Sequence, residues 1–134
     1  MRLLFLLAAL VIAAAPVARA GDDVAAAQSV IRSQEEAFGR DDGAAAYEFA
    51  APSIKSWFRT PEVFMNMVRN GYAPVYRHRS FEFGAAKITD GKILQTVHII
   101  DADGAAWEAL YTLEAQADGN LKISSCVLAK AVIS

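Results

Sequence analysis

Three Asp-Gly pairs constrain the fold of this 134-residue chain more than any other feature. They stand between runs of about ten residues in which apolar and polar side chains alternate. Such a pair between two alternating runs is the strongest short-range signal of a β-hairpin, because Asp and Gly tolerate the positive φ angles of a tight turn. The pairs are residues 90–91, 103–104 and 118–119. They predict a four-stranded antiparallel meander over residues 80–89, 92–101, 105–117 and 120–132.

The residues before these runs have the spacing of helices. Apolar positions recur every three or four residues between 22 and 40, where Asp22 and Asp23 are placed to cap the first turn. Further helices are predicted over residues 43–50 and 61–69. Helices followed by strands predict an α+β domain, in which three N-terminal helices pack on one face of a curved four-stranded antiparallel sheet.

Two short segments link the helices to one another and to the strands. Ser53 is placed to cap one helical turn over residues 53–58. Residues 72–76 contain Pro74, which disfavours helical geometry at the residue before it, so this connector is expected to be extended.

Residues 1–20 have the three parts of a secretory signal peptide. Arg2 precedes an apolar run over residues 3–15, and the triplet Ala18-Arg19-Ala20 follows as a cleavage site. The run is shorter than the roughly 20 residues that a permanent membrane-spanning helix needs, although an uncleaved signal anchor is the alternative. We expect cleavage after Ala20, a periplasmic or secreted product without membrane attachment, and a single domain over residues 21–134.

The composition excludes several classes of function. The 13 Lys and Arg residues are balanced by 15 Asp and Glu, so no basic stripe is available for nucleic acid. Cys126 is the single cysteine and has no intrachain partner. His78 and His98 stand apart in the sequence, outside any cluster with metal-ligand spacing, and no glycine-rich nucleotide motif occurs. We therefore expect no metal, no cofactor and no nucleic-acid partner.

Alternation within the strands assigns side chains to faces of the sheet. Gln95 shares its face with Ile93 and Val97, so it points toward the helices, where a buried amide needs a hydrogen-bond partner. A backbone carbonyl, a connector tyrosine or a ligand would satisfy it. The inward aromatic residues of the third strand are either core or pocket wall. The pocket candidates are Gln95, Tyr72, Tyr76, Trp107, Tyr111 and Arg77.

The same alternation in the other strands separates a core face from an exposed face. The inward residues of the last strand are predicted to be Leu121, Ile123, Val127 and Ala129. The outward apolar residues, a candidate surface for a homodimer, are predicted to be Leu94, Ile100, Leu110 and Leu128.

Several stretches that are ordinary alone form a specific combination across residues 21–134. They are QEEAF at 34–38, Asp41-Asp42, AYEFAAP at 46–52, FRTP at 58–61, Gly71-Tyr72 with PVYR at 74–77, Gln95 with Val97, Trp107 with Ala109 and Tyr111, and Ile123 with Cys126. In these residues the chain resembles a family of small secreted bacterial proteins, domain of unknown function 4864. The resemblance implies an α+β fold related to the cone-like nuclear transport factor two-like and cystatin-like folds, and it implies no activity.

Three hypotheses of function follow. The first is a non-enzymatic domain that binds a small ligand or a protein in a cavity between helices and sheet. The second is an isomerase- or dehydratase-like enzyme whose acid or base would be Asp41, Glu82 or His98, although the parity of His98 is opposite to that of Gln95. The third is a structural module that dimerises through the exposed face of the sheet.

Overall fold

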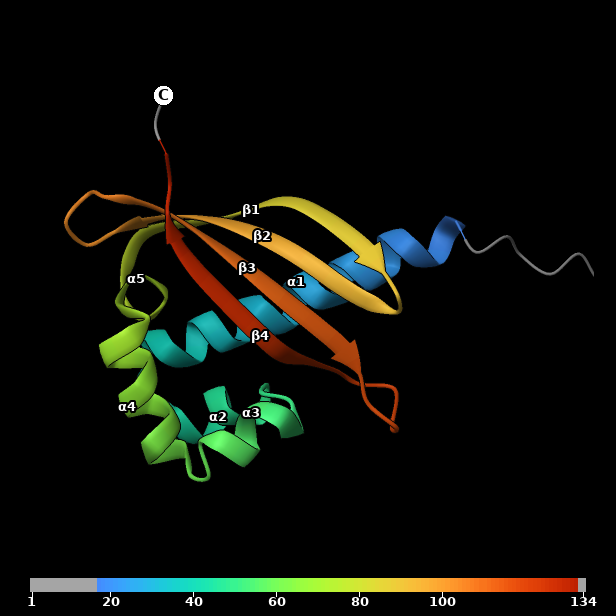
Figure 1. The fold of residues 1–134 in the computed structure, drawn as a ribbon, viewed down its shortest axis with the longest axis horizontal. Coiled ribbons are helices and arrows are strands. Elements are labelled where there is room, and N and C mark those ends of the chain that lie inside the picture. Colours follow the sequence, from blue (N-terminus) through green and yellow to red (C-terminus); the bar gives the residue numbers. More distant parts are fainter. Residues whose placement is uncertain (1–16, 133–134) are drawn as a thin grey trace, which may run out of the picture.

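The computed structural model describes residues 17–132, which form an α+β fold with five helices and one open four-stranded antiparallel sheet (Figure 1). The helices are α1 (Val17–Gly39), α2 (Gly43–Glu48), α3 (Pro52–Trp57), α4 (Pro61–Gly71) and α5 (Ala73–Tyr76). The strands are β1 (His78–Thr89), β2 (Lys92–Asp101), β3 (Ala106–Ala115) and β4 (Leu121–Lys130), which lie side by side in chain order.

The chain reverses at all three Asp-Gly pairs, as predicted. Asp90 and Gly91 have φ angles of 51° and 74°, the geometry of a tight hairpin turn between β1 and β2. Gly104 and Gly119 also have positive φ angles, 88° and 86°, and connect the next two strand pairs. These turns set the register of the sheet.

The prediction of three N-terminal helices was wrong in number, because two short helices are added. The turn expected over residues 53–58 is α3, with Pro52 in its first turn. The connector over residues 72–76 contains α5, which tolerates Pro74 because the first turn of a helix needs no backbone N–H from that residue.

The first helix begins earlier than predicted. Because α1 starts at Val17, Asp22 and Asp23 lie within the helix and do not cap its first turn. Most of the predicted signal peptide, residues 1–16, lies outside the described residues. None of the helices in residues 17–132 combines the length and apolarity needed to cross a membrane.

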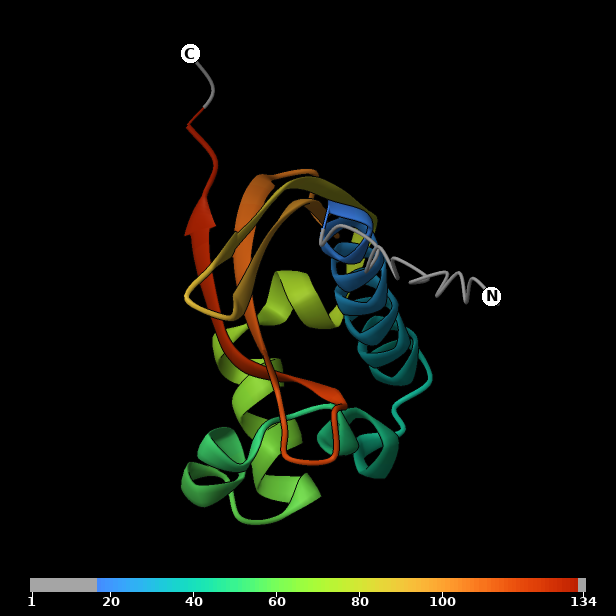
Figure 2. The ribbon, with the colours of Figure 1, turned by 90° about the vertical axis from the view of Figure 1, so that its right-hand side faces the viewer.

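The core lies between α1 and the inner face of the sheet, which curves over the helix (Figure 2). The buried α1 side chains recur every three or four positions: Ala27, Ile31, Gln34 and Phe38. From the sheet they meet the buried side chains of Val97, Ile99, Tyr111 and Leu113. The opposite face of the sheet carries exposed residues, among them His98, Glu108 and Leu110.

The predicted faces of β4 are correct only in its first half. The pairing of β3 with β4 shifts between Leu113–Ile123 and Thr112–Ser125, so β4 has one extra residue there. A bulge of this kind exchanges the faces of the residues that follow it. Val127 is therefore 59% exposed and Ala129 is exposed, whereas Cys126 and Leu128 pack against the core.

Candidate functional site

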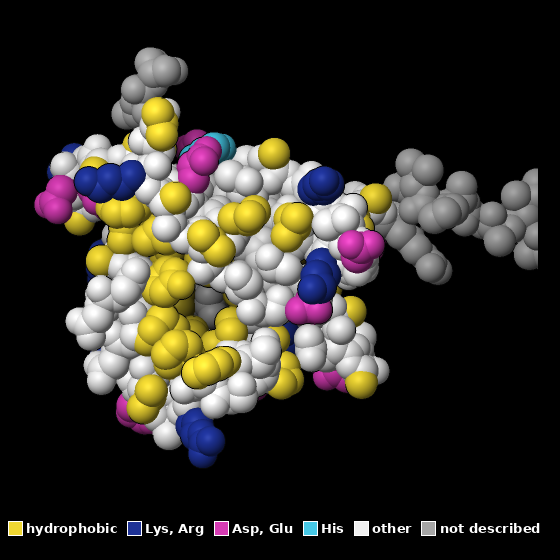
Figure 3. All heavy atoms as spheres, viewed as in Figure 1, with side chains coloured by type: hydrophobic (Ala, Val, Ile, Leu, Met, Phe, Trp, Pro, Cys, Tyr) yellow, Lys and Arg dark blue, Asp and Glu magenta, His cyan; other side chains and the backbone are white. Residues whose placement is uncertain are grey.

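A pocket of about 400 Å³ opens between β4 and the helices α3 and α4 (Figure 3). We call it the main pocket. None of its lining residues is exposed, and six of them are buried. It is lined by Gln34, Phe38, Ile54, Phe58, Phe64, Met67, Val68, Tyr72, Val75, Tyr111, Ser125 and Cys126. A concave, mostly apolar site of this size with few polar groups is typical of small-molecule binding.

Local structure holds the walls of the main pocket in place. On one side, the Thr60 hydroxyl accepts a hydrogen bond from the Val63 N–H at 3.2 Å and so caps α4, where Pro61 is the first residue. On the other side, the segment before α3 pairs with β4. Its Ala51 N–H donates to the Ile123 carbonyl, and the Ile123 N–H donates to the Phe49 carbonyl, both at 2.8 Å.

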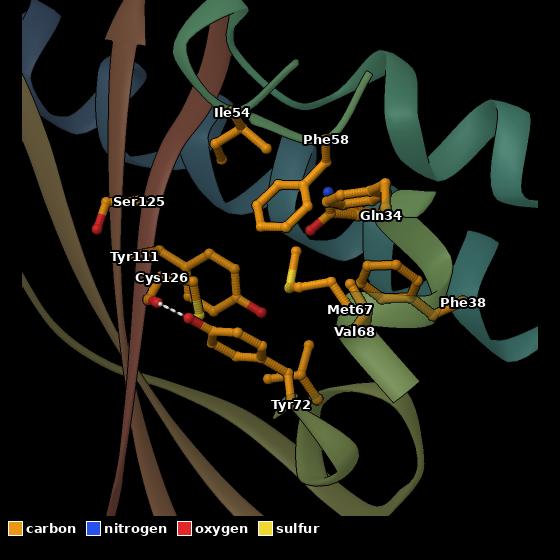
Figure 4. A pocket seen from close by; sticks show the side chains of 12 residues that line it. Gln34, Phe38, Ile54, Phe58, Met67, Val68, Tyr72, Tyr111, Ser125 and Cys126 are labelled. Atoms are coloured by element: carbon orange, nitrogen blue, oxygen red, sulfur yellow. Dashed lines mark hydrogen bonds between the residues drawn. The ribbon is translucent and has the colours of Figure 1, made fainter. Parts of the chain in front are cut away.

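Few polar atoms reach the main pocket, and their orientations are defined (Figure 4). The Tyr72 hydroxyl donates to the Cys126 carbonyl at 3.1 Å. The Gln34 Nε2 atom donates to the Ala46 carbonyl at 3.1 Å, which fixes the Gln34 side-chain amide. Tyr111, 2% exposed, lies beside Cys126, its partner in the β3–β4 pairing.

The lining carries no formal charge at neutral pH. No Asp, Glu, His, Lys or Arg is among the lining residues of the main pocket. Burial raises the pKa of the Cys126 thiol to about 12, and contact with the Tyr111 hydroxyl opposes that shift. Burial also raises the pKa values of Tyr111 and Tyr72 above the ordinary tyrosine value. The thiol and both phenols are therefore neutral.

Gln95 points toward the helices, as its parity predicted, but the protein itself satisfies its amide. Its Nε2 atom lies 2.7 Å from the Thr96 carbonyl and 3.1 Å from the Gly84 carbonyl. Its Oε1 atom accepts from Gln28 Nε2 at 3.0 Å. Gly84 and Ala85 form an irregularity in β1, between Phe83 and Ala86, where the pairing with β2 shifts. Gln95 thus bonds two carbonyls at this shift, and it is not among the residues that line the main pocket.

The six predicted pocket residues do not share one cavity. Tyr72 and Tyr111 line the main pocket. Trp107 and Arg77 line a second hollow, and Tyr72 belongs to the lining of both. There the Trp107 indole N–H donates to Asp101 Oδ2 at 2.8 Å. Tyr76 lies with Arg77 at a third surface hollow. The structure therefore distributes these residues over three hollows and the interior of the sheet, and the chain turns into α5 between Tyr72 and Tyr76.

Sequence reasoning missed most of the pocket wall. Gln34 was not among the predicted pocket residues, yet it stands three residues after Ile31 and four before Phe38, on the buried stripe of α1. That spacing is a signal that could have identified it. No sequence signal places α3 and α4 opposite β4, so the lining residues from this part of the chain could not be found. They are Ile54, Phe58, Phe64, Met67 and Val68.

The acids and the base considered for an enzyme lie away from the main pocket. Glu82 and His98 are exposed, and His98 faces Glu108 across the outer side of the sheet with 3.4 Å between Nδ1 and Oε1. Asp41 follows α1 at the surface. Within residues 17–132 no three His, Cys, Asp or Glu side chains gather in a way that could hold a metal ion.

Asp41, Tyr76 and Arg77 form a surface cluster beside the C-terminal end of α1, which we call the Asp41 cluster. Asp41 has a φ angle of 55°, its carboxylate accepts a hydrogen bond from the Tyr76 hydroxyl, and its Oδ2 atom lies 3.0 Å from Arg77 Nη2. A second guanidinium nitrogen of Arg77, Nη1, donates to the Phe38 carbonyl at 2.8 Å. Arg77 is therefore engaged within the protein.

We expect the Asp41 cluster to stabilise the fold in a pH-dependent way. The Tyr76 hydroxyl first, and Arg77 to a smaller extent, lower the pKa of Asp41 below 3.8. A lowered pKa in the folded state contributes stability above the unfolded-state pKa, and this contribution is lost as pH falls through the folded value. Asp41→Asn, which tolerates the same φ angle, should lower the urea midpoint at pH 6 and progressively less below pH of about 4. A midpoint difference that stays constant down to pH 2 would contradict this.

Comparison with known proteins places the chain in a family without assigning it an activity. The family described as a domain of unknown function (DUF4864) matches residues 20–133. The chain belongs to the DUF4864 family. No curated protein and no solved structure matches it. Other hollows in the described part of this DUF4864 domain are larger, about 520 and 480 Å³, but charged side chains line them, whereas the lining of the main pocket is uncharged.

Proposed function

We propose that this DUF4864 domain is a secreted, non-enzymatic binding domain that holds a small molecule in the main pocket. The proposal includes a signal peptide over residues 1–20, one domain over residues 21–134 and a fold related to the nuclear transport factor two-like cone. The observation that carries it is the pocket itself, about 400 Å³ with an uncharged and mostly apolar lining. The N-terminal sequence supports export.

The arrangement of the lining favours binding over catalysis. General acid or base chemistry needs a titrating group within hydrogen-bond reach of the substrate, with a pKa near the working pH. The titratable groups that line the main pocket are Tyr72, Tyr111 and Cys126, and burial moves each pKa away from neutrality. Contact with apolar walls instead removes the apolar surface of a ligand from water, which makes the free energy of binding more favourable.

Filling the main pocket should abolish binding. Met67 lines the pocket from α4, so Met67→Trp would place an indole in the space that a ligand needs. Val63 lies on the same helix, is 48% exposed and does not line the pocket, so Val63→Trp is a matched control. We expect Met67→Trp to weaken binding of the probe 4-ethylphenol at least tenfold, measured by calorimetry, while Val63→Trp binds as the wild type does.

Native mass spectrometry gives an independent test on protein purified from the periplasm of an expression host. We expect wild type and Val63→Trp to carry a co-purified small molecule that Met67→Trp lacks. Equal occupancy of the two tryptophan variants would place the ligand outside the main pocket. If the wild type binds no small molecule and 4-ethylphenol does not bind at millimolar concentration, the proposed function is wrong.

A homodimer through the outer face of the sheet is the second candidate. Its support is a set of apolar side chains that are partly or largely exposed on this face: Ile100 at 36%, Leu110 at 40% and Val127 at 59%. Leu128 was predicted to belong to this set but packs against the core, whereas Val127 is exposed on the outer face. Sedimentation of wild type and Leu110→Glu decides the question, since a dimer through this face should dissociate in the variant.

A further inference from the structure

The wall of the main pocket contains a hydrogen-bond acceptor, on the buried residue Gln34, that the protein leaves free. Gln34 is 5% exposed, and its amide orientation is set because only Nε2 can donate to the Ala46 carbonyl. Among the described residues no donor bonds to Gln34 Oε1, whereas every fully buried side-chain N or O atom there has a partner. The Oε1 atom is therefore accessible, and the space that Gln34 lines is the main pocket.

The surroundings of this acceptor restrict what can occupy the pocket. Figure 4 shows the Gln34 amide among the side chains of Phe58 and Met67, which cannot donate a hydrogen bond to it. The hydroxyl groups in the lining belong to Tyr72, Tyr111 and Ser125, and none of them donates to Gln34 Oε1. The Tyr72 hydroxyl donates to the Cys126 carbonyl, and Tyr111 packs beside the Cys126 thiol. A charged ligand would meet no opposite charge in the lining, so its desolvation would not be compensated.

We propose that the main pocket selects neutral, largely apolar molecules that carry one hydroxyl or N–H group, which donates to Gln34 Oε1. This inference rests on the proposed function and adds the ligand class. The apolar part of the ligand lies against Phe38, Phe58 and Val68, and the donor end lies at α1. A donor satisfies a buried acceptor that an apolar ligand would leave without a partner.

Two probes of nearly equal shape separate this inference from simple hydrophobic binding. 4-Ethylphenol carries a hydroxyl where 4-ethyltoluene carries a methyl group. In a pocket that offers no acceptor, 4-ethyltoluene binds more tightly, because 4-ethylphenol loses its hydrogen bonds to water on binding. With Gln34 Oε1 as acceptor, we expect the phenol to bind about tenfold more tightly than the toluene. 4-Ethylbenzoate, the charged probe, should bind at least tenfold more weakly than the phenol.

Binding is followed through the methyl resonances of the methionines, because Met67 lines the main pocket and Met65 is buried outside it. A shift at Met67 with 4-ethylphenol and a smaller response with 4-ethyltoluene at equal concentration supports the ligand class. If both probes shift Met67 with equal or reversed affinity, or the benzoate binds best, the ligand class is wrong while the binding function stands. If no probe shifts Met67, the proposed function itself fails.

Gln34→Leu tests the acceptor directly. We expect the preference for 4-ethylphenol to be lost or reversed, with the affinity for 4-ethyltoluene within a few-fold of the wild type. Gln28→Leu is the control, since Gln28 is a glutamine of the same helix that bonds Gln95 and does not line the pocket. An unchanged preference in Gln34→Leu contradicts the assignment. The wild-type comparison of the two probes decides the matter even if Gln34→Leu does not fold.

Discussion

Replacement of Gln95 by leucine should destabilise the protein by roughly 2–4 kcal/mol without changing the affinity of the main pocket for 4-ethylphenol. Gln95 is fully buried, and its Nε2 atom reaches the carbonyls of Gly84, Ala85 and Thr96. Leucine has a similar volume and no donor. The carbonyls at the irregularity in β1 would then lose this partner, and each one that water does not reach costs about 1–3 kcal/mol.

The matched variant is Gln28→Ala, which removes only the partner of Gln95 Oε1. Because Gln28 is half-buried, water can replace it, and we expect a loss of about 1 kcal/mol or less. Urea unfolding measures both free energies. If Gln95→Leu is as stable as the wild type, or if it loses binding while keeping its stability, then Gln95 has the ligand role and not the structural one.

The Cys126 thiol should be close to inert in the folded protein. Only the thiolate attacks a disulfide reagent, and burial raises the pKa of this thiol from its ordinary value of 9.0 to about 12. The thiolate fraction at neutral pH is then lower by about a thousandfold, so reaction with a disulfide reagent should be slower by a similar factor in native than in urea-unfolded protein. Stopped-flow absorbance at pH 7.5 measures the two rates.

A cysteine at the neighbouring position 127 is the control, because its thiol is accessible to the reagent. Val127 is on the outward side of the bulge in β4, so a protein with Val127→Cys and Cys126→Ser presents an exposed thiol one residue away. This thiol should react at nearly the unfolded rate. A native Cys126 that reacts within tenfold of this control would show that the thiol is not buried, and the description of the pocket wall around Tyr111 would have to change.

The order of elements could be predicted because its signals are local. A tight turn between strands requires positive φ angles, which Asp90 with Gly91 supply, and the same reasoning held for Gly104 and Gly119. The α+β class and the four-stranded antiparallel sheet followed from these turns. The helical stripe of α1 followed likewise from spacing alone, since Ile31 and Phe38 recur with the period of a helix.

The faces of the strands could be predicted only up to the first irregularity. A one-residue shift reverses every later side chain, and the stretch around Ser124 and Ser125 has no composition that marks a bulge. The prediction therefore placed Val127 inside and Leu128 outside, the reverse of the structure. Cys126, which was not among the predicted pocket residues, follows the bulge and lies in the wall of the main pocket.

Local patterns and residue identities were enough to predict the turns, the strand order, the amphipathic stripe of α1 and the family, because each depends on residues close together in the chain or on a pattern of identities. The side chains that form the main pocket could be found only in the folded chain. The pocket wall joins α1, α3, α4, α5, β3 and β4, and the residues that meet there, such as Gln34 and Cys126, are far apart in sequence. Their meeting depends on how helices pack on a bulged sheet, and that packing leaves no local signal.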